Sequence, residues 1–158
     1  MSSANVLLIT DRPGFEPIWG PACAQFALDA VVMKPSALAG AMHRGRAVVF
    51  DAESKRYGDE DELLSAIGFA RALGGHVAVQ RPGTMEEVDD LLEEMCPGLV
   101  ARDTSDANRI CQLIARRLDA DRAYRFEFLT LSPRPNELLA ILGDGRSTLI
   151  ARPICEGD

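Results

Sequence analysis

Short apolar runs alternate with longer stretches of helical periodicity between residues 5 and 118. The short runs are rich in β-branched residues, which is typical of strands buried on both faces of a sheet; they cover 5–11, 30–33, 46–51, 76–80 and 98–101. The stretches between them repeat apolar residues three and four positions apart, which predicts helices over 22–28, 35–45, 59–73, 85–95 and 105–118. The pattern therefore predicts five strand–helix repeats.

Strands that alternate with helices form a parallel sheet covered by helices on both faces. We therefore expect an α/β fold over residues 1–120, a doubly wound five-stranded parallel sheet of flavodoxin-like order. The segment that follows the first strand contains Pro13, Pro17, Gly20 and Pro21. Because proline and glycine disfavour helix interiors, we expect the first helix to begin only after this segment.

Residues 121–158 have a different pattern and form a second segment, a C-terminal extension. Apolar side chains alternate at the start of 124–131, as in a half-buried strand. An Asp-Gly pair lies between the apolar runs 138–142 and 149–151, and such a pair is typical of a β-hairpin. We expect an antiparallel β extension, with a helix over 136–151 as the alternative.

Charge and composition narrow the class of protein. There are 17 Lys and Arg against 24 Asp and Glu, a net charge of −7, and no basic run. This balance argues against a nucleic-acid binder or a partner of anionic membranes, since both depend on clustered cations. No apolar run approaches the roughly 18 residues that a membrane span needs, and no basic stretch leads into a signal-peptide core. We expect a cytoplasmic protein.

The four cysteines, at positions 23, 96, 111 and 155, show neither the spacing of a zinc site nor a dense disulfide framework. We interpret them as small buried hydrophobic residues in a reducing compartment. No glycine-rich phosphate loop follows the first strand, and His43 and His76 have no Ser or Cys partner at a catalytic spacing. We expect no enzymatic activity and no bound cofactor.

Polar residues follow the predicted strands. Asp11 comes after the first strand, Asp51 after the third, Gln80 and Arg81 after the fourth, and Arg102 after the fifth. In a parallel sheet the functional crevice lies at the carboxyl ends of the strands, so these side chains form the candidate site. Two nearby carboxylates can bind Mg²⁺, or one can act as a nucleophile toward a phosphoryl group.

In strand–helix order and in these strand-end positions, residues 5 to about 119 resemble the receiver domain of bacterial response regulators, the CheY-like domain of two-component systems. The resemblance implies that Asp51 occupies the position of the phospho-acceptor. It also implies that Asp11 belongs to the acidic pocket and that Asp11 and Asp51 are the ligands of any Mg²⁺.

The sequence departs from that family at three places. Receivers have two acidic residues after the first strand, where this chain has Thr10 and Asp11. They have Ser or Thr at the end of the fourth strand, where this chain has Gln80 or Arg81. They have Lys at the end of the fifth strand, where Arg102 keeps the charge but changes the geometry. We interpret the chain as a degenerate receiver, a pseudo-receiver.

In this interpretation Asp51 pairs with Arg102, and the protein acts in signal transduction by protein–protein interaction. The partner is a histidine kinase or another regulator, and the chain forms a homodimer through residues 121–158. As in receivers, the acidic run 86–94 is the first candidate for a partner surface. The alternative within the fold is a phosphorylatable receiver with Asp51 as acceptor and Mg²⁺ as cofactor.

Two further functions stay open. Arg12, Arg81 and Arg102 are able to line a site for an anionic nucleotide or second messenger, because guanidinium groups bind phosphate bidentately. We favour ion pairs with the abundant acidic residues instead. The residues from Leu131 to Arg134 are similar to the start of a LuxR-type helix-turn-helix, which would make the chain a truncated transcriptional regulator. It ends before a recognition helix, so we do not favour DNA binding.

Overall fold

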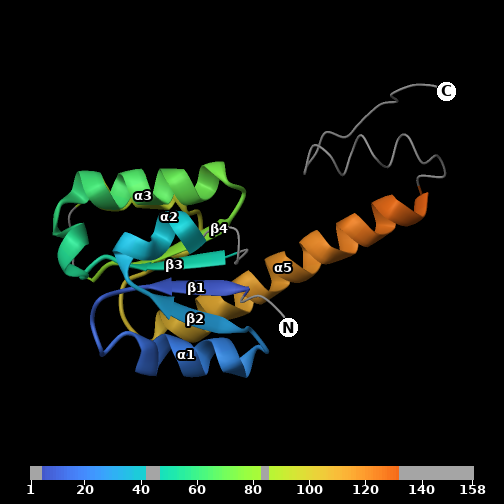
Figure 1. Cartoon of the computed structure of the whole chain (residues 1–158), viewed down its shortest axis with the longest axis horizontal. Helices are drawn as coiled ribbons and strands as arrows, with labels where there is room; N and C mark the ends of the chain where they lie inside the picture. Colours follow the sequence, from blue (N-terminus) through green and yellow to red (C-terminus); the bar gives the residue numbers. More distant parts are fainter. Residues whose placement is uncertain (1–4, 42–46, 83–85, 132–158) are drawn as a thin grey trace. The chain divides into compact units, whose positions relative to one another are not determined.

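The computed structural model describes residues 5–41, 47–82 and 86–131 (Figure 1), with side chains over 5–41, 47–82 and 88–122. The chain divides into two units, Met1–Leu118 and Asp119–Asp158. The first unit contains the sheet and its covering helices. Within the described residues, no helix is both long and apolar enough to span a membrane.

All five strands of the sheet are parallel: β1 (Val6–Ile9), β2 (Ala30–Met33), β3 (Ala47–Asp51), β4 (His76–Gln80) and β5 (Val100–Ala101). Their order is β2-β1-β3-β4-β5, which confirms the flavodoxin-like sheet predicted from the sequence. The register aligns Ile9 with Phe50, Asp51 with Gln80, and Gln80 with Ala101. This alignment brings the carboxyl ends of β1, β3, β4 and β5 to one edge.

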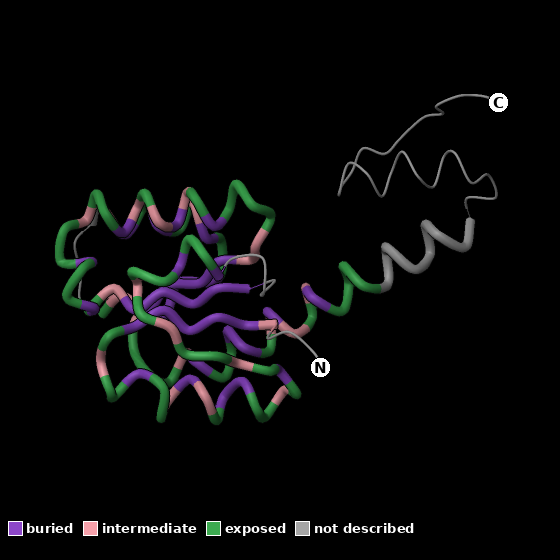
Figure 2. The backbone as a smooth tube through the Cα atoms, in the orientation of Figure 1, coloured by how far each residue is buried: buried purple, intermediate pink, exposed green. Residues whose placement is uncertain are grey.

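The helices are α1 (Glu16–Gln25), α2 (Leu38–Ala41), α3 (Glu60–Ala72), α4 (Glu86–Met95) and α5 (Asp106–Leu131), with short 3₁₀ turns η1 (Pro35–Ala37) and η3 (Lys55–Gly58). Figure 1 shows α2 and α3 on one face of the sheet and α1 on the other. Every residue of β1 and β3 is buried as a result, and Figure 2 shows this buried centre between helices with exposed outer faces. The edge strand β2 keeps Val31 and Val32 exposed.

Helix α1 begins earlier than the sequence predicts and continues through Gly20 and Pro21. Pro17 lies in its first turn, where a missing N–H costs nothing because that group has no partner within the helix. The inner face buries Trp19 and Cys23 against the sheet and its neighbouring helix. This burial offsets the backbone hydrogen bond lost at Pro21. Local helix propensity does not include such tertiary contacts, so the sequence pattern did not predict the helix here.

The predicted strand over 124–131 is wrong, because α5 continues as a helix to Leu131. No glycine or proline occurs between Asp106 and Leu131, so the helix extends without a second costly nucleation. An ion pair between Arg122 and Asp119, three residues apart, lies along this part of the helix. The predicted hairpin at 138–151, and the helix that is its alternative over 136–151, lie outside the described residues.

Candidate functional site

Asp51 ends the central strand β3, and its side chain is fully buried, with 0% exposed. Four donors surround the carboxylate. Thr10 donates from Oγ1 to Oδ2 at 2.6 Å, and the backbone N–H of Glu53 donates to Oδ1 at 3.0 Å. Arg12 donates from Nε to Oδ2 at 2.7 Å and from Nη2 to Oδ1 at 2.8 Å.

An ionised carboxylate offers about four lone-pair positions to donors. Each oxygen of Asp51 accepts two hydrogen bonds, so these positions are all used. No oxygen of Asp51 is left to bind a metal ion or to attack a phosphorus atom while these contacts hold. The site is therefore closed by the protein's own side chains.

Arg12 makes the main contribution to this closure. Its guanidinium forms a bidentate pair with Asp51 and also contacts Glu53, with Nη1 2.9 Å from Oε1. The hydrogen bond to Asp51 raises the pKa of Arg12 above its ordinary value, so the side chain keeps its charge. It remains 34% exposed, which places the guanidinium between the buried carboxylate and solvent.

The expected pair of Asp51 and Arg102 is wrong. Arg102 instead contacts Asp89 on α4, with Nη1 2.6 Å from Oδ2. The strand order explains the difference: β1 is the direct neighbour of β3, whereas β4 separates β3 from β5. A cation that follows β1 is therefore closer to Asp51 than a cation that follows β5. The strand order predicted from the sequence is the feature that favours Arg12 over Arg102 as the partner.

Asp11 has partners different from those of Asp51. Its carboxylate accepts the backbone N–H of Lys55 at 3.0 and 3.2 Å, and its own N–H donates to the Ser54 hydroxyl at 3.2 Å. These bonds tie the loop after β1 to the loop after β3. In the part of the chain that the structure describes, no three His, Cys, Asp or Glu side chains are grouped as a metal site.

Gln80 at the end of β4 is also engaged within the protein. Its Oε1 accepts a hydrogen bond from Trp19 Nε1 at 2.5 Å, and both side chains are buried. Trp19 also stacks on Phe15, with ring centroids 5.7 Å apart. The side chain at the position of the receiver hydroxyl thus anchors α1 to the sheet, a contact that sequence reasoning missed because the two residues are 61 positions apart.

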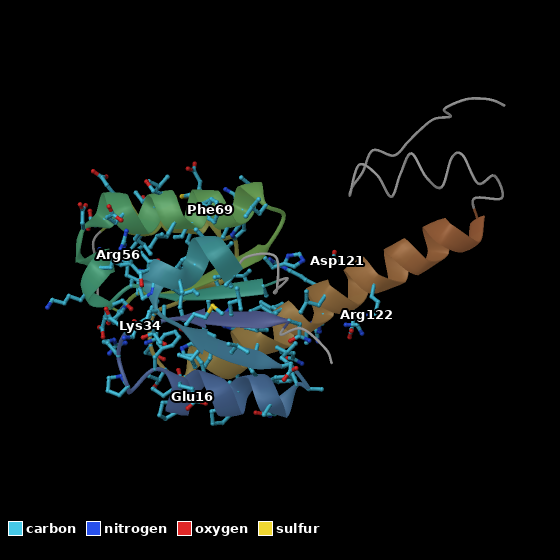
Figure 3. All side chains as sticks on the ribbon, in the orientation of Figure 1. Glu16, Lys34, Arg56, Phe69, Asp121 and Arg122 are labelled. Atoms are coloured by element: carbon cyan, nitrogen blue, oxygen red, sulfur yellow. The ribbon has the colours of Figure 1, made fainter. Side chains whose placement is uncertain are left out.

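A second cluster of charges joins α3, α4 and the ends of β4 and β5. Arg81 contacts Glu60 on α3 at 3.2 Å and Asp89 on α4 at 3.4 Å, and Asp89 also pairs with Arg102. The three strand-end arginines therefore all face carboxylates, as the ion-pair interpretation expects. Figure 3 labels two exposed cations beyond the carboxyl ends of other strands, Lys34 after β2 and Arg56 in η3 after β3.

Neither the protein-family models nor the curated proteins include a match to this chain. The fold agrees with a receiver at the level of strand order and connectivity. At the strand ends, Asp51 is held by Thr10 and Arg12. Gln80 binds Trp19, and Arg102 binds Asp89.

Proposed function

We propose that this chain is a pseudo-receiver, a signal-transduction module that acts by protein–protein interaction without catalytic turnover. One observation carries the proposal. The carboxylate in the phospho-acceptor position, Asp51, is buried and held by Arg12, Thr10 and the Glu53 backbone.

Phosphoryl transfer needs an accessible carboxylate oxygen in line with the phosphorus atom and a cation that neutralises developing charge. For Asp51 to react, Arg12 would have to leave and a buried charge would lose its partner, which is costly. The guanidinium already supplies the positive charge that Mg²⁺ supplies in a receiver. It does so from a fixed side chain, so the pocket is held in one state.

Because the pocket around Asp51 is held in one state, we expect the module to act through its surface contacts with other proteins. The outer face of α4 exposes Asp90, Glu93 and Glu94, which form an acidic patch. A protein with a basic surface, such as a histidine kinase or another regulator, fits this patch by charge. We place the partner contact here and expect its association rate to fall as salt is added.

Phosphorylation in solution tests the proposal. We expect the full chain, incubated with acetyl phosphate and Mg²⁺, to show no phosphorylated species by intact mass spectrometry, while a competent receiver treated in parallel does. A phosphorylated species that disappears in Asp51→Ala would refute the pseudo-receiver and establish the phosphorylatable receiver with Asp11 and Asp51 as metal ligands.

Thermal-shift measurements separate the pseudo-receiver from an anion-binding domain. The pseudo-receiver predicts no stabilisation by Mg²⁺ with beryllium fluoride, a phosphoryl mimic, and none by nucleotides. Stabilisation by a nucleotide that is lost in Arg102→Ala would favour the anion-binding domain. Sequence-specific DNA binding would favour the truncated regulator, whose defining segment lies outside the described residues.

A further inference from the structure

Two buried cysteine side chains meet where α1 packs against α5. Cys23 lies on α1 and Cys111 on α5, with their Sγ atoms 3.7 Å apart in a hydrogen bond between thiols. The two residues are 88 positions apart in sequence and are 1% and 0% exposed. The fold alone therefore creates this pair, which the cysteine spacing does not indicate.

We propose that Cys23 and Cys111 are a redox-modification site at which a hydroperoxide converts the two thiols into a disulfide bond between α1 and α5. A disulfide has its sulfur atoms about 2.0 Å apart, so the sulfurs must approach by about 1.7 Å. We expect rotation of the two side chains and a small shift of α1 against α5 to supply this approach.

The two thiols differ in acidity because each affects the other. The hydrogen bond lowers the pKa of Cys23, against the opposing effect of burial, and raises that of Cys111. The thiolate is the nucleophilic form of cysteine, which makes Cys23 the attacking residue. Cys96 is equally buried, but its pKa is not lowered by a hydrogen bond from a second thiol, and burial raises it to about 11.

The reaction balances with one hydroperoxide. The Cys23 thiolate attacks the terminal peroxide oxygen, an S–O bond forms, the O–O bond breaks, and the departing alkoxide takes the proton that Cys23 released. The Cys111 sulfur then attacks the sulfenic acid on Cys23. An S–S bond forms, the S–O bond breaks, and the proton of Cys111 leaves with the hydroxide as water. Both sulfurs are oxidised, and the peroxide is reduced to an alcohol and water.

Burial of the two thiols limits the rate of oxidation, and the disulfide formed restricts the movement of α1 and α5. Because both sulfurs are covered, a peroxide reaches them only when α1 and α5 separate locally, so oxidation reports that opening. The bond then prevents further opening, since it closes a loop of 88 positions. Closing a loop of this length stabilises a domain considerably.

Hydrogen peroxide applied to the full chain tests the proposal. After oxidation, free thiols are alkylated under unfolding conditions and the digest is mapped without reductant. We expect one reducible linkage, between the peptides of Cys23 and Cys111, and a rise in Tm on the order of 10 °C. Cys23→Ala and Cys111→Ala remove the linkage, whereas the matched control Cys96→Ala retains it.

The peptide map of the peroxide-treated wild-type chain tests the proposal even if an alanine variant fails to fold. Complete alkylation of both thiols after peroxide treatment would overturn the proposal. A sulfinic acid at Cys23 without a linkage, or a linkage that involves Cys96 or Cys155 in place of this pair, would overturn it as well.

Discussion

At the scale of single residues, the dominant feature is a buried carboxylate with its full set of donors. A buried ion pair contributes little net stability, because both groups lose hydration, but the loss of one partner is costly. The pair of Arg12 and Asp51 is intermediate, because the Asp51 carboxylate is fully buried whereas the Arg12 side chain is 34% exposed. The main effect of the pair is that the Arg12 guanidinium occupies the space beside the Asp51 carboxylate.

This pair predicts a double-mutant cycle. Arg12→Met leaves the Asp51 carboxylate buried without its cation, so we expect the free energy of unfolding to fall by about 2–3 kcal/mol, below the usual cost for fully buried pairs because Arg12 is partly exposed. Asp51→Asn in the same chain should recover part of the loss. Urea denaturation of the two single variants and the double variant measures the coupling. Strictly additive losses would show that the two side chains do not stabilise each other.

At the scale of elements, helix ends and loop contacts hold the strand ends in place. The long helix α5 begins at Asp106, whose Oδ2 accepts the backbone N–H of Arg102 at 2.9 Å and whose Oδ1 lies 3.3 Å from Arg109. This carboxylate connects the end of β5 to the first turn of the helix. The bond from Arg102 is the largest cause that lowers the pKa of Asp106.

The lowered pKa of Asp106 predicts a pH dependence of stability. Because its pKa in the folded state lies below the unfolded value of about 3.9, the carboxylate stabilises the fold above that pH, and the contribution is lost as the pH falls through the folded-state pKa. We expect Asp106→Ala to cost about 1 kcal/mol at pH 7, the typical net contribution of a hydrogen bond, and progressively less below pH 4. Chemical denaturation across this range measures it, with the exposed Asn108→Ala as control. A difference that stays constant with pH would contradict this role.

At the scale of the whole molecule, the chain divides into two units, Met1–Leu118 and Asp119–Asp158. The first contains the receiver-like sheet and the closed pocket. The second begins at Asp119 and includes the end of α5, and we expect it to mediate self-association. The apolar runs at 138–142 and 149–151 in the sequence motivate this expectation, because an apolar segment that the rest of a chain does not cover tends to pair with a second copy.

Self-association is tested by light scattering coupled to size exclusion. We expect the full chain to have the mass of a dimer, and charged substitutions within 138–142 to convert it to a monomer without loss of helical circular dichroism. A full chain with the mass of a monomer at all concentrations would contradict dimerisation. The pseudo-receiver proposal does not depend on the result.

The positions of the five strands, the parallel α/β class and the location of Asp51 at the end of β3 followed from the sequence alone. These features depend on local patterns, since a buried strand needs continuous apolar residues wherever it lies in the fold. The expected strand order, together with the resemblance to receivers, also predicted that the Asp51 carboxylate lies at the carboxyl end of the central strand.

Only the tertiary structure decided the partners of these residues and the extent of two helices. Arg12 pairs with Asp51 because β1 adjoins β3, while Arg102 lies two strands away and pairs with Asp89. Helix α1 continues through Pro21 because its inner face is buried, and α5 continues past the point where side-chain alternation suggested a strand. Contact between Cys23 and Cys111 likewise depends on helix packing, because which distant residues meet is set by the arrangement of whole elements rather than by local sequence.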